Sequence, residues 1–431
     1  MSNTLTVQET SLTAIADEIR KKTGKKDKIK FPAGFVSEID SIQTGGGSAP
    51  AEEVKEKDVN FFDYDGTLIA SYTEAEAKAL TTLPTPPAHS GLVFQGWNYT
   101  LEEVKANAEM ADIGALYTTD DGATRLEIEI ASESRKDMKI CFFQSKQSGV
   151  LIDWGDGNSE RSAAVTGPTF ATHDYEATGH YTIKLTVDDD CEVKLGQNNG
   201  GVMVSFNASA GYYYKAELLS VNIGNHITGL NTGAFQYSYG LSMVSMTKGI
   251  TSIDAACFKC SGIRYITIPA GIDTIDYDTF NECYALSNIS LPVSMQNVGN
   301  NAFRTCQVLR RVDIKRITNP GSYVFAECNN LKEISLKEEI TYIPNGILAG
   351  CKSLARVEFL GNVKMLYSYA LRGCTSIKTV DFTHCTAIPT AQSEIFYNYP
   401  SDLEILVPAA LAEEWKQATN WTAFASKIKG V

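Results

Sequence analysis

The sequence predicts a multidomain, mainly β protein with a short N-terminal helical arm, a small β-rich module, a β-sandwich, a long repeat solenoid and a C-terminal helical cap. Two observations predict this fold class. The 431 residues exceed the size of one ordinary domain, for which about 150 residues is a common guide. The C-terminal half also repeats one pattern at a regular interval, which is the signature of stacked repeats.

The repeat has the pattern I-x-x-I-x-x-x-A-F-x-x-C-x-x-L-x-x-I-x-L and recurs every 22 or 23 residues. The end of each copy alternates apolar and polar residues, which is typical of a short β-strand. One copy is too small to bury its own apolar face, so neighbouring copies are expected to stack into a solenoid over residues 201–385. The leading position of the seven copies is occupied by Ile227, Ile250, Ile272, Met295, Ile317, Ile340 and Val363.

Cysteine occupies a second column of the pattern. Free cysteine packs as a small apolar residue, so we expect buried thiols in the solenoid core. Cys257 and Cys260 have the spacing of a redox or zinc pair, but no matching second pair is present, and the repeat already accounts for Cys260. Six of the ten cysteines lie in this column: Cys260, Cys283, Cys306, Cys328, Cys351 and Cys374.

The A-F-x-x-C and L-x-x-I-x-L-P signatures of residues 216–385 resemble the leucine-rich repeats of the BspA-like surface-antigen type. The resemblance implies a solenoid of a kind used for adhesion. Residues 386–431 would then form the cap that a solenoid needs over its open core, with Trp415 and Trp421 in that role.

Two motifs before the repeats resemble the polycystic-kidney-disease (PKD) domain. They are W-G-D-G at Trp154–Gly157 and Y-x-x-x-G-x-Y-x-I-x-L-x-V at Tyr175–Val187. The resemblance implies a small β-sandwich over residues 119–200 that serves spacing or adhesion. Its aspartates could hold Ca²⁺, but no ligand loop of fixed spacing is visible, and we favour turn and strand-end residues. These aspartates are Asp153, Asp156, Asp188, Asp189 and Asp190.

The stretch Asp63-Tyr64-Asp65-Gly66-Thr67 raises the hypothesis of an enzyme, because it resembles the nucleophile loop of the haloacid-dehalogenase phosphatases. In that family the first Asp attacks phosphorus and Mg²⁺ offsets the charge. That fold also needs further parallel strands carrying catalytic residues, for which this chain has no room. We therefore expect a hairpin turn between strands Phe61–Tyr64 and Thr67–Ser71. We expect no enzyme, no catalytic residue, no cofactor and no metal.

Residues 58–118 resemble instead a module of phage tail-associated structural proteins and the small β-grasp repeats of Gram-positive surface proteins. The motifs are Ser-Tyr-Thr, Leu-Pro-x-x-Pro-x-His-x-Gly-Leu and Gly-Trp-Asn. Trp97 is expected in the core of this module and a short helix at Leu101–Ala108. His89 is expected to be a turn or packing residue.

Residues 1–43 contain two short amphipathic segments that cannot bury enough surface alone. They resemble the leader of phage tail and baseplate proteins, which implies attachment to other virion proteins, and analogy with other fibres suggests a homotrimer. Residues 44–57 are expected to be a flexible linker. The candidate attachment residues are Leu12, Ile15, Ile19, Phe35, Val36 and Ile39.

Charge and hydropathy exclude other classes of protein. The net charge of −13 argues against a nucleic-acid partner. No apolar run reaches the roughly 20 residues that span a bilayer. The first residues lack the apolar region of a signal peptide, so we expect a protein made in the host cytoplasm.

These features together predict a non-enzymatic structural protein of the virion surface, a phage fibre or receptor-binding protein. The alternative is a BspA-like bacterial cell-surface adhesin. The repeats would bind a surface glycan or protein through outward-facing strand residues, since polar side chains beside an aromatic suit such ligands. The candidate residues are Tyr265, Thr267, Asn288, Arg311, Asp313, Glu333, Arg356, Glu358, Thr379 and Asp381.

Overall fold

The computed structural model describes residues 56–133, 136–196, 203–206, 217–312, 314, 316–336 and 338–431. The predicted attachment residues between Leu12 and Ile39, and the candidate binding residue Asp313, lie outside this range. None of the described helices is long and apolar enough to cross a membrane.

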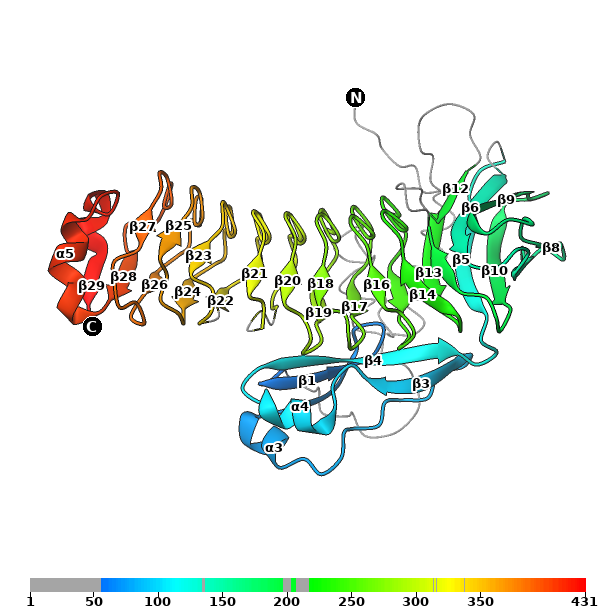
Figure 1. Ribbon diagram of the computed structural model, residues 1–431, viewed down its shortest axis with the longest axis horizontal. Coiled ribbons are helices and arrows are strands. Elements are labelled where there is room, and N and C mark those ends of the chain that lie inside the picture. Colours follow the sequence, from blue (N-terminus) through cyan, green and yellow to red (C-terminus); the bar gives the residue numbers. More distant parts are fainter. Residues whose placement is uncertain are drawn as a thin grey trace, which may run out of the picture. The chain divides into compact units, whose positions relative to one another are not determined.

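A small four-stranded sheet with two short helices forms the first part of the described chain (Figure 1). We call residues 56–119 the N-terminal module. Its central strands run parallel to each other, and each has an antiparallel neighbour at the edge, in the order β2-β1-β4-β3. Its elements are β1 (Val59–Phe62), β2 (Leu68–Tyr72), α3 (Glu74–Lys78), β3 (Leu92–Trp97), α4 (Leu101–Ala106) and β4 (Ala111–Thr119).

The hairpin predicted around Asp65-Gly66 is confirmed. The amide of Asp63 donates to the carbonyl of Thr67 at 2.8 Å, and β1 pairs with β2 on either side. Trp97 is buried in the core of the module, as predicted, with its ring 4.9 Å from that of Phe61. The resemblance to β-grasp repeats stays a prediction.

Two sheets follow the N-terminal module, and both continue into the repeats. The first contains β5 (Thr124–Ile130), β7 (Val150–Asp153), β8 (Ser159–Arg161), β10 (Gly179–Val187), β13 (Glu217–Asn222) and β15 (Met243–Ser245). The second contains β6 (Asp137–Gln144), β9 (Gly167–Asp174), β11 (Val193–Leu195), β12 (Val204–Phe206), β14 (Ile227–Leu230) and β16 (Ser252–Ile253).

Antiparallel pairing of β13 with β5 and parallel pairing of β14 with β11 join these sheets to the first coils. These two sheets and the repeats therefore share one hydrophobic core across the boundary predicted at residue 200. Strands β5 and β11 pair with the edges of β13 and β14 that the first coil would otherwise expose, and so cover this coil. The β-sandwich stays a prediction. The PKD resemblance stays a prediction.

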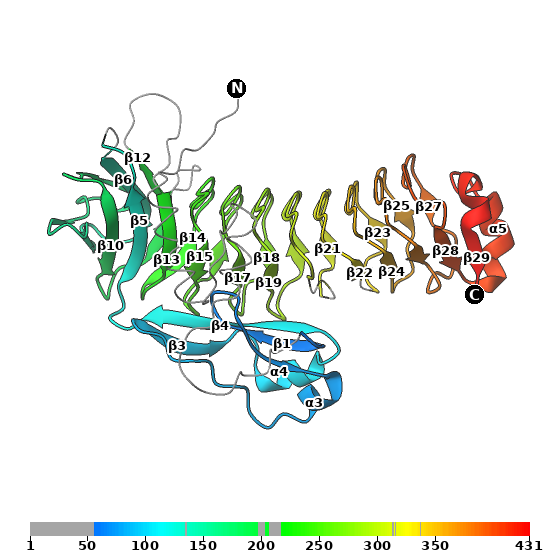
Figure 2. The same cartoon turned by 180° about the vertical axis from the view of Figure 1, so that it is seen from behind.

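The repeats form a solenoid whose coils contribute strands to two ladders, visible side by side in Figure 2. Strands that pair along these ladders run parallel. The long-strand ladder continues from β15 with β17 (Tyr265–Thr267), β19 (Asn288–Ser290), β22 (Glu333–Leu336), β24 (Arg356–Phe359), β26 (Thr379–Asp381), β28 (Glu404–Val407) and β29 (Ile428–Gly430). The short-strand ladder continues from β16 with β18 (Thr274–Ile275), β20 (Asn297–Val298), β21 (Asn319–Pro320), β23 (Tyr342–Ile343), β25 (Met365–Leu366) and β27 (Thr390–Ala391).

The phenylalanine column of the repeat stacks along the solenoid core. Neighbouring rings have centroids between 5.3 and 5.5 Å apart, and the planes of the later pairs are nearly parallel. The column consists of Phe235, Phe258, Phe280, Phe303 and Phe325 and is continued by the buried side chains of Leu348 and Leu371.

The cysteine column lies beside these rings, and its thiols donate to backbone carbonyls of the preceding coil. Cys283 Sγ lies 3.0 Å from the carbonyl oxygen of Phe258, and Cys351 Sγ lies 3.0 Å from that of Phe325. All ten cysteines are free and buried, so the prediction of core thiols is confirmed. The same contact is made by Cys306, Cys328 and Cys374.

Alkylation of the folded protein at pH 8 is expected to modify almost none of the thiols. Burial raises the pKa of Cys283, Cys328 and Cys374 to about 12, so the reactive thiolate is scarce, and the side chains are also shielded from reagent. Mass spectrometry after iodoacetamide treatment measures this. The same treatment in denaturant should label all ten, and rapid labelling of the column without denaturant would contradict the prediction.

The C-terminal segment closes the other end of the solenoid with η1 (Ala409–Leu411), α5 (Ala412–Gln417) and η2 (Thr422–Lys427) (Figure 1). Trp415 and Trp421 are fully buried and lie 5.7 and 5.6 Å from the ring of Phe382, measured between centroids. Two large side chains thus cover the last coil.

Candidate functional site

The N-terminal module covers the first half of the predicted binding face. Tyr265, Thr267 and Asn288 are 3%, 2% and 7% exposed, so the expectation that they face solvent is wrong. Strand β4 lies against β17 and β19, as both views of the ribbon show (Figures 1 and 2). The approach is so close that a Cβ on Gly114 would collide with the side chain of Thr267.

Polar side chains fix the module on the solenoid. Asn98 donates from Nδ2 to the carbonyl of Ile268 at 3.0 Å and to Ser290 Oγ at 2.9 Å. Ser290 in turn donates to the carbonyl of Asp112 at 2.6 Å. The hydroxyl of Tyr99 donates to the carbonyl of Leu291 at 3.1 Å. All of these atoms are buried, so the interface is specific and not a loose surface contact.

Arg311 belongs to the same interface. Its guanidinium donates to the carbonyls of Lys57 and Asp58 at 2.9 and 2.8 Å, and its Nε lies 3.3 Å from Oδ2 of Asp112. Asp112 is only 2% exposed at its side chain, so this ion pair is largely shielded from water. The geometry therefore gives Arg311 a role in holding the module.

The second half of the predicted face is open. Glu333 is exposed, and Arg356, Glu358 and Thr379 are partly exposed. Together with Ser335 they form what we call the open strand face, on β22, β24 and β26. Arg356 lies 3.4 Å from Glu358. The face thus combines both charges and hydroxyl groups on a rigid ladder.

Asp381 was predicted to face solvent, but its side chain is buried and the residue is only 6% exposed. It accepts hydrogen bonds from the amide and hydroxyl of Thr383 and pairs with Arg356 at 2.9 Å. Burial alone would raise the pKa of Asp381, but these hydrogen bonds and the nearby positive charge outweigh burial and lower it. Its carboxylate orients Arg356 from beneath the open strand face.

A groove interrupts the short-strand ladder on the other side of the solenoid. Strands β21 and β23 belong to different sheets. In the neighbouring coils, the amides of Gly321 and Tyr367 donate to Val298 and Ile343. The equivalent position in the intervening coil is Pro344, which has no N–H and cannot make this bond. The missing donor contributes to the gap between β21 and β23. Strands β16 and β18 also belong to different sheets, although Asp276 at the equivalent position has an N–H.

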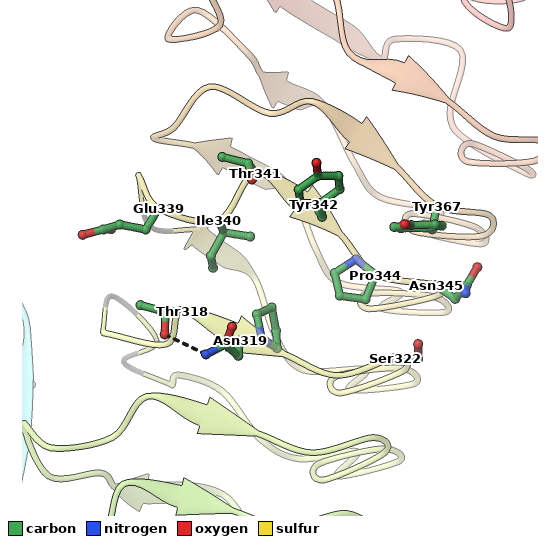
Figure 3. A pocket seen from close by; sticks show the side chains of 11 residues that line it. Thr318, Asn319, Ser322, Glu339, Ile340, Thr341, Tyr342, Pro344, Asn345 and Tyr367 are labelled. Atoms are coloured by element: carbon green, nitrogen blue, oxygen red, sulfur yellow. Dashed lines mark hydrogen bonds between the residues drawn. The ribbon is translucent and has the colours of Figure 1, made fainter.

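This opening, which we call the ladder groove, has a volume of about 460 Å³. Figure 3 shows Tyr342 and Tyr367 on neighbouring coils beside Pro344, with Asn319 on the opposite wall. Tyr342 is 54% exposed. The lining residues are Thr318, Asn319, Pro320, Ser322, Glu339, Ile340, Thr341, Tyr342, Pro344, Asn345 and Tyr367.

The Asp63 motif forms a compact polar cluster inside the module. Asp63 is 2% exposed and its Oδ2 lies 2.7 Å from Nε2 of His89, whose ring packs against Tyr64 and Tyr117. Burial and the adjacent Asp63 carboxylate raise the pKa of Tyr117. His89 thus pairs with Asp63 as well as packing. No group of three or more potential metal ligands occurs among the described residues.

The aspartates of the sandwich turn bind backbone amides of their own turn. Asp153 accepts from the amide of Gly155 at 2.9 Å, and Asp156 accepts from that of Asn158 at 3.0 Å. Asp156 also pairs with Nε2 of His173 at 2.7 Å. These contacts are those of turn residues.

Stacked coils, parallel ladders and the cysteine column together define a leucine-rich-repeat solenoid. The family model described as "BspA type Leucine rich repeat region" matches residues 207–320 and 278–404, with six copies. The repeat segment of this chain is therefore of the BspA type. No curated protein matches the chain.

Solved leucine-rich-repeat proteins resemble parts of the chain. A leucine-rich-repeat protein of T. pallidum is 25% identical, with a TM-score of 0.32, over 34% of this chain and 72% of that one. A protein of Bacteroides ovatus is 16% identical, with a TM-score of 0.25, over 48% and 76%. A leucine rich cell surface protein of Faecalibacterium prausnitzii is 17% identical, with a TM-score of 0.21, over 46% and 84%.

Proposed function

We propose that the chain is a non-enzymatic adhesion protein whose solenoid recognises a glycan or protein on another surface. The open strand face carries this proposal. It presents charged and hydroxyl side chains on β22, β24 and β26. Strand β22 borders the module across a cleft that Glu333 and Ser335 line together with Glu109 and Met110. Side chains fixed on a paired ladder lose little conformational freedom on binding, which favours recognition.

A bacterial cell-surface adhesin is the better supported setting. The BspA-type match covers the repeats, and the resemblance of these repeats is to surface antigens. In this setting the N-terminal module and the sandwich position the solenoid, and the open strand face contacts the target.

A phage fibre or receptor-binding protein is the second candidate. Residues 1–43 resemble a tail-protein leader, and residues 58–118 resemble a tail-associated module. In this setting the leader attaches the chain, as a homotrimer, to other virion proteins, and the ligand lies on a host bacterium.

Labelled full-length protein is expected to bind saturably to at least one member of a panel of Gram-positive strains and epithelial cells. A double variant with lysine in place of both Glu333 and Thr379 should bind about tenfold more weakly, because the substitutions change the charge of the open strand face. Flow cytometry over a concentration series measures the affinity. Selective binding to bacterial strains supports the fibre, and binding to epithelial cells supports the adhesin.

The matched control is Glu413→Lys in the cap, where the side chain is 80% exposed and remote from the open strand face. Its affinity should equal that of the unmodified protein. Equal affinity of the double variant and this control would contradict a binding role for the open strand face. Circular dichroism of each variant checks that the fold is retained.

A further inference from the structure

We propose that the ladder groove is a binding site for a short neutral oligosaccharide. The inference deepens the proposed adhesion function, on which it rests, by naming a second surface and a ligand class. The volume of about 460 Å³ lies within the roughly 300–1,000 Å³ usual for small-molecule sites.

Proline contributes to the gap between the two strands that flank the groove. Pro344 occupies the position from which a backbone amide would donate to the preceding coil, as Gly321 and Tyr367 do in their own coils. Strands β21 and β23 therefore stay unpaired with each other. Pairing would bring neighbouring strands to about 4.8 Å, which would close the space between them.

Hydrogen bonds between neighbouring turns join the two coils beside the groove. The amide of Tyr323 donates to the carbonyl of Asn345 at 2.8 Å, and that of Phe325 donates to Ile347 at 2.9 Å. These bonds join the same two coils that separate at β21 and β23. The groove is thus a preformed hollow in a rigid stack, and a ligand would bind with little rearrangement.

The lining matches the chemistry of a sugar. Tyr342 and Tyr367 offer aromatic surfaces on which the C–H faces of a pyranose ring can lie, and Figure 3 shows them on adjacent coils. Asn319 and Asn345 carry amides that both donate and accept, which suits hydroxyl groups. Ile340 is buried at the base and gives the floor an apolar surface.

Two other ligand classes fit less well. An anionic ligand would find no lysine or arginine among the eleven lining residues, and the net charge of the chain is −13. An extended peptide that added a strand to β21 or β23 would need backbone donors. Pro320 and Pro344 remove a donor from each wall. The polar and aromatic lining, in which Glu339 is the one charged residue and can accept from hydroxyl groups, therefore favours a sugar.

The test measures binding of maltotetraose, cellotetraose, mannotetraose and chitotetraose to the full chain by saturation-transfer difference NMR. At least one is expected to bind saturably. Replacing Tyr342 with alanine should weaken that binding about tenfold, the loss of one aromatic contact. The matched control is Tyr277→Ala, since Tyr277 is 53% exposed and lies outside the groove lining. Its affinity should stay unchanged.

Binding of none of the four oligosaccharides would overturn the proposal, and so would equal losses in the Tyr342 and Tyr277 variants. A second variant, Asn319→Ala, should also weaken binding. It tests the groove from the opposite wall, so a local folding defect at Tyr342 would not explain both losses. Cell binding without oligosaccharide binding would contradict the groove as a sugar site but still support the adhesion function. Oligosaccharide binding without cell binding would support the groove as a sugar site but contradict the adhesion function.

Discussion

Replacing Phe303 with alanine is expected to lower the free energy of unfolding by about 3–5 kcal/mol, the range for a fully buried phenylalanine. The ring is 0% exposed and lies between Phe280 and Phe325, with centroids 5.4 and 5.5 Å away. Truncation would leave a cavity in the middle of the stack. Each coil contacts only its neighbours, so the loss is expected to weaken both adjoining interfaces. Urea denaturation followed by circular dichroism measures the change.

The same substitution at an exposed phenylalanine provides the control. Phe170 on β9 is 46% exposed, and Phe170→Ala should cost less than about 1 kcal/mol, as is usual for surface positions. Equal losses at the two positions would contradict the view that the phenylalanine column is the main packing element of the solenoid.

Replacing Arg311 with alanine is expected to release the N-terminal module from the solenoid. The change removes two hydrogen bonds to the backbone of Lys57 and Asp58 and leaves Asp112 without this ion pair. Asp112 is 2% exposed but Arg311 is 23% exposed, so the loss should lie between the ~0–1 kcal/mol of an exposed pair and the ~3–5 kcal/mol of a buried one. Hydrogen–deuterium exchange should therefore accelerate in β17 and β19, where the module now covers the coils.

Arg304 provides a matched control for this experiment. It pairs with Glu327 at 3.4 Å, but its side chain is 45% exposed. Exposed pairs contribute about 0–1 kcal/mol, so Arg304→Ala should leave exchange in β17 and β19 unchanged. Unchanged exchange in the Arg311 variant as well would show that the remaining contacts, such as those of Asn98 and Tyr99, hold the module by themselves.

The sequence predicted the solenoid well because its evidence is periodic. One apolar column every 22 or 23 residues fixes which side chains enter the core, and the structure buries the phenylalanine and cysteine columns accordingly. The hairpin at Asp65-Gly66 was also predictable, since its evidence is local. Periodicity shows which residues stack with their equivalents, but it says nothing about what lies against the other face of the strand.

The docking of the module could not be predicted for that reason. Asn98 and Ser290 are separated by 192 residues, and neither the Gly-Trp-Asn motif nor the repeat pattern indicates that they meet. The predicted binding face therefore included Tyr265 and Asn288, which the module covers. The ladder groove, in contrast, had a usable signal. Pro320 lies in β21 and Pro344 directly follows β23, so each removes a backbone donor from the two strands beside the groove.

The division of the long-strand ladder into a covered and an open part has a consequence for how such proteins can vary. The module rests on β17 and β19, whereas the helical cap lies after β28. Whole copies of the repeat could be gained or lost between β22 and β28 without altering either end. Each added coil would lengthen the stack by about 4.8 Å and extend the open strand face by one row of side chains. Reach and contact area could thus evolve in fixed steps, while the parts that make the chain fold stay the same.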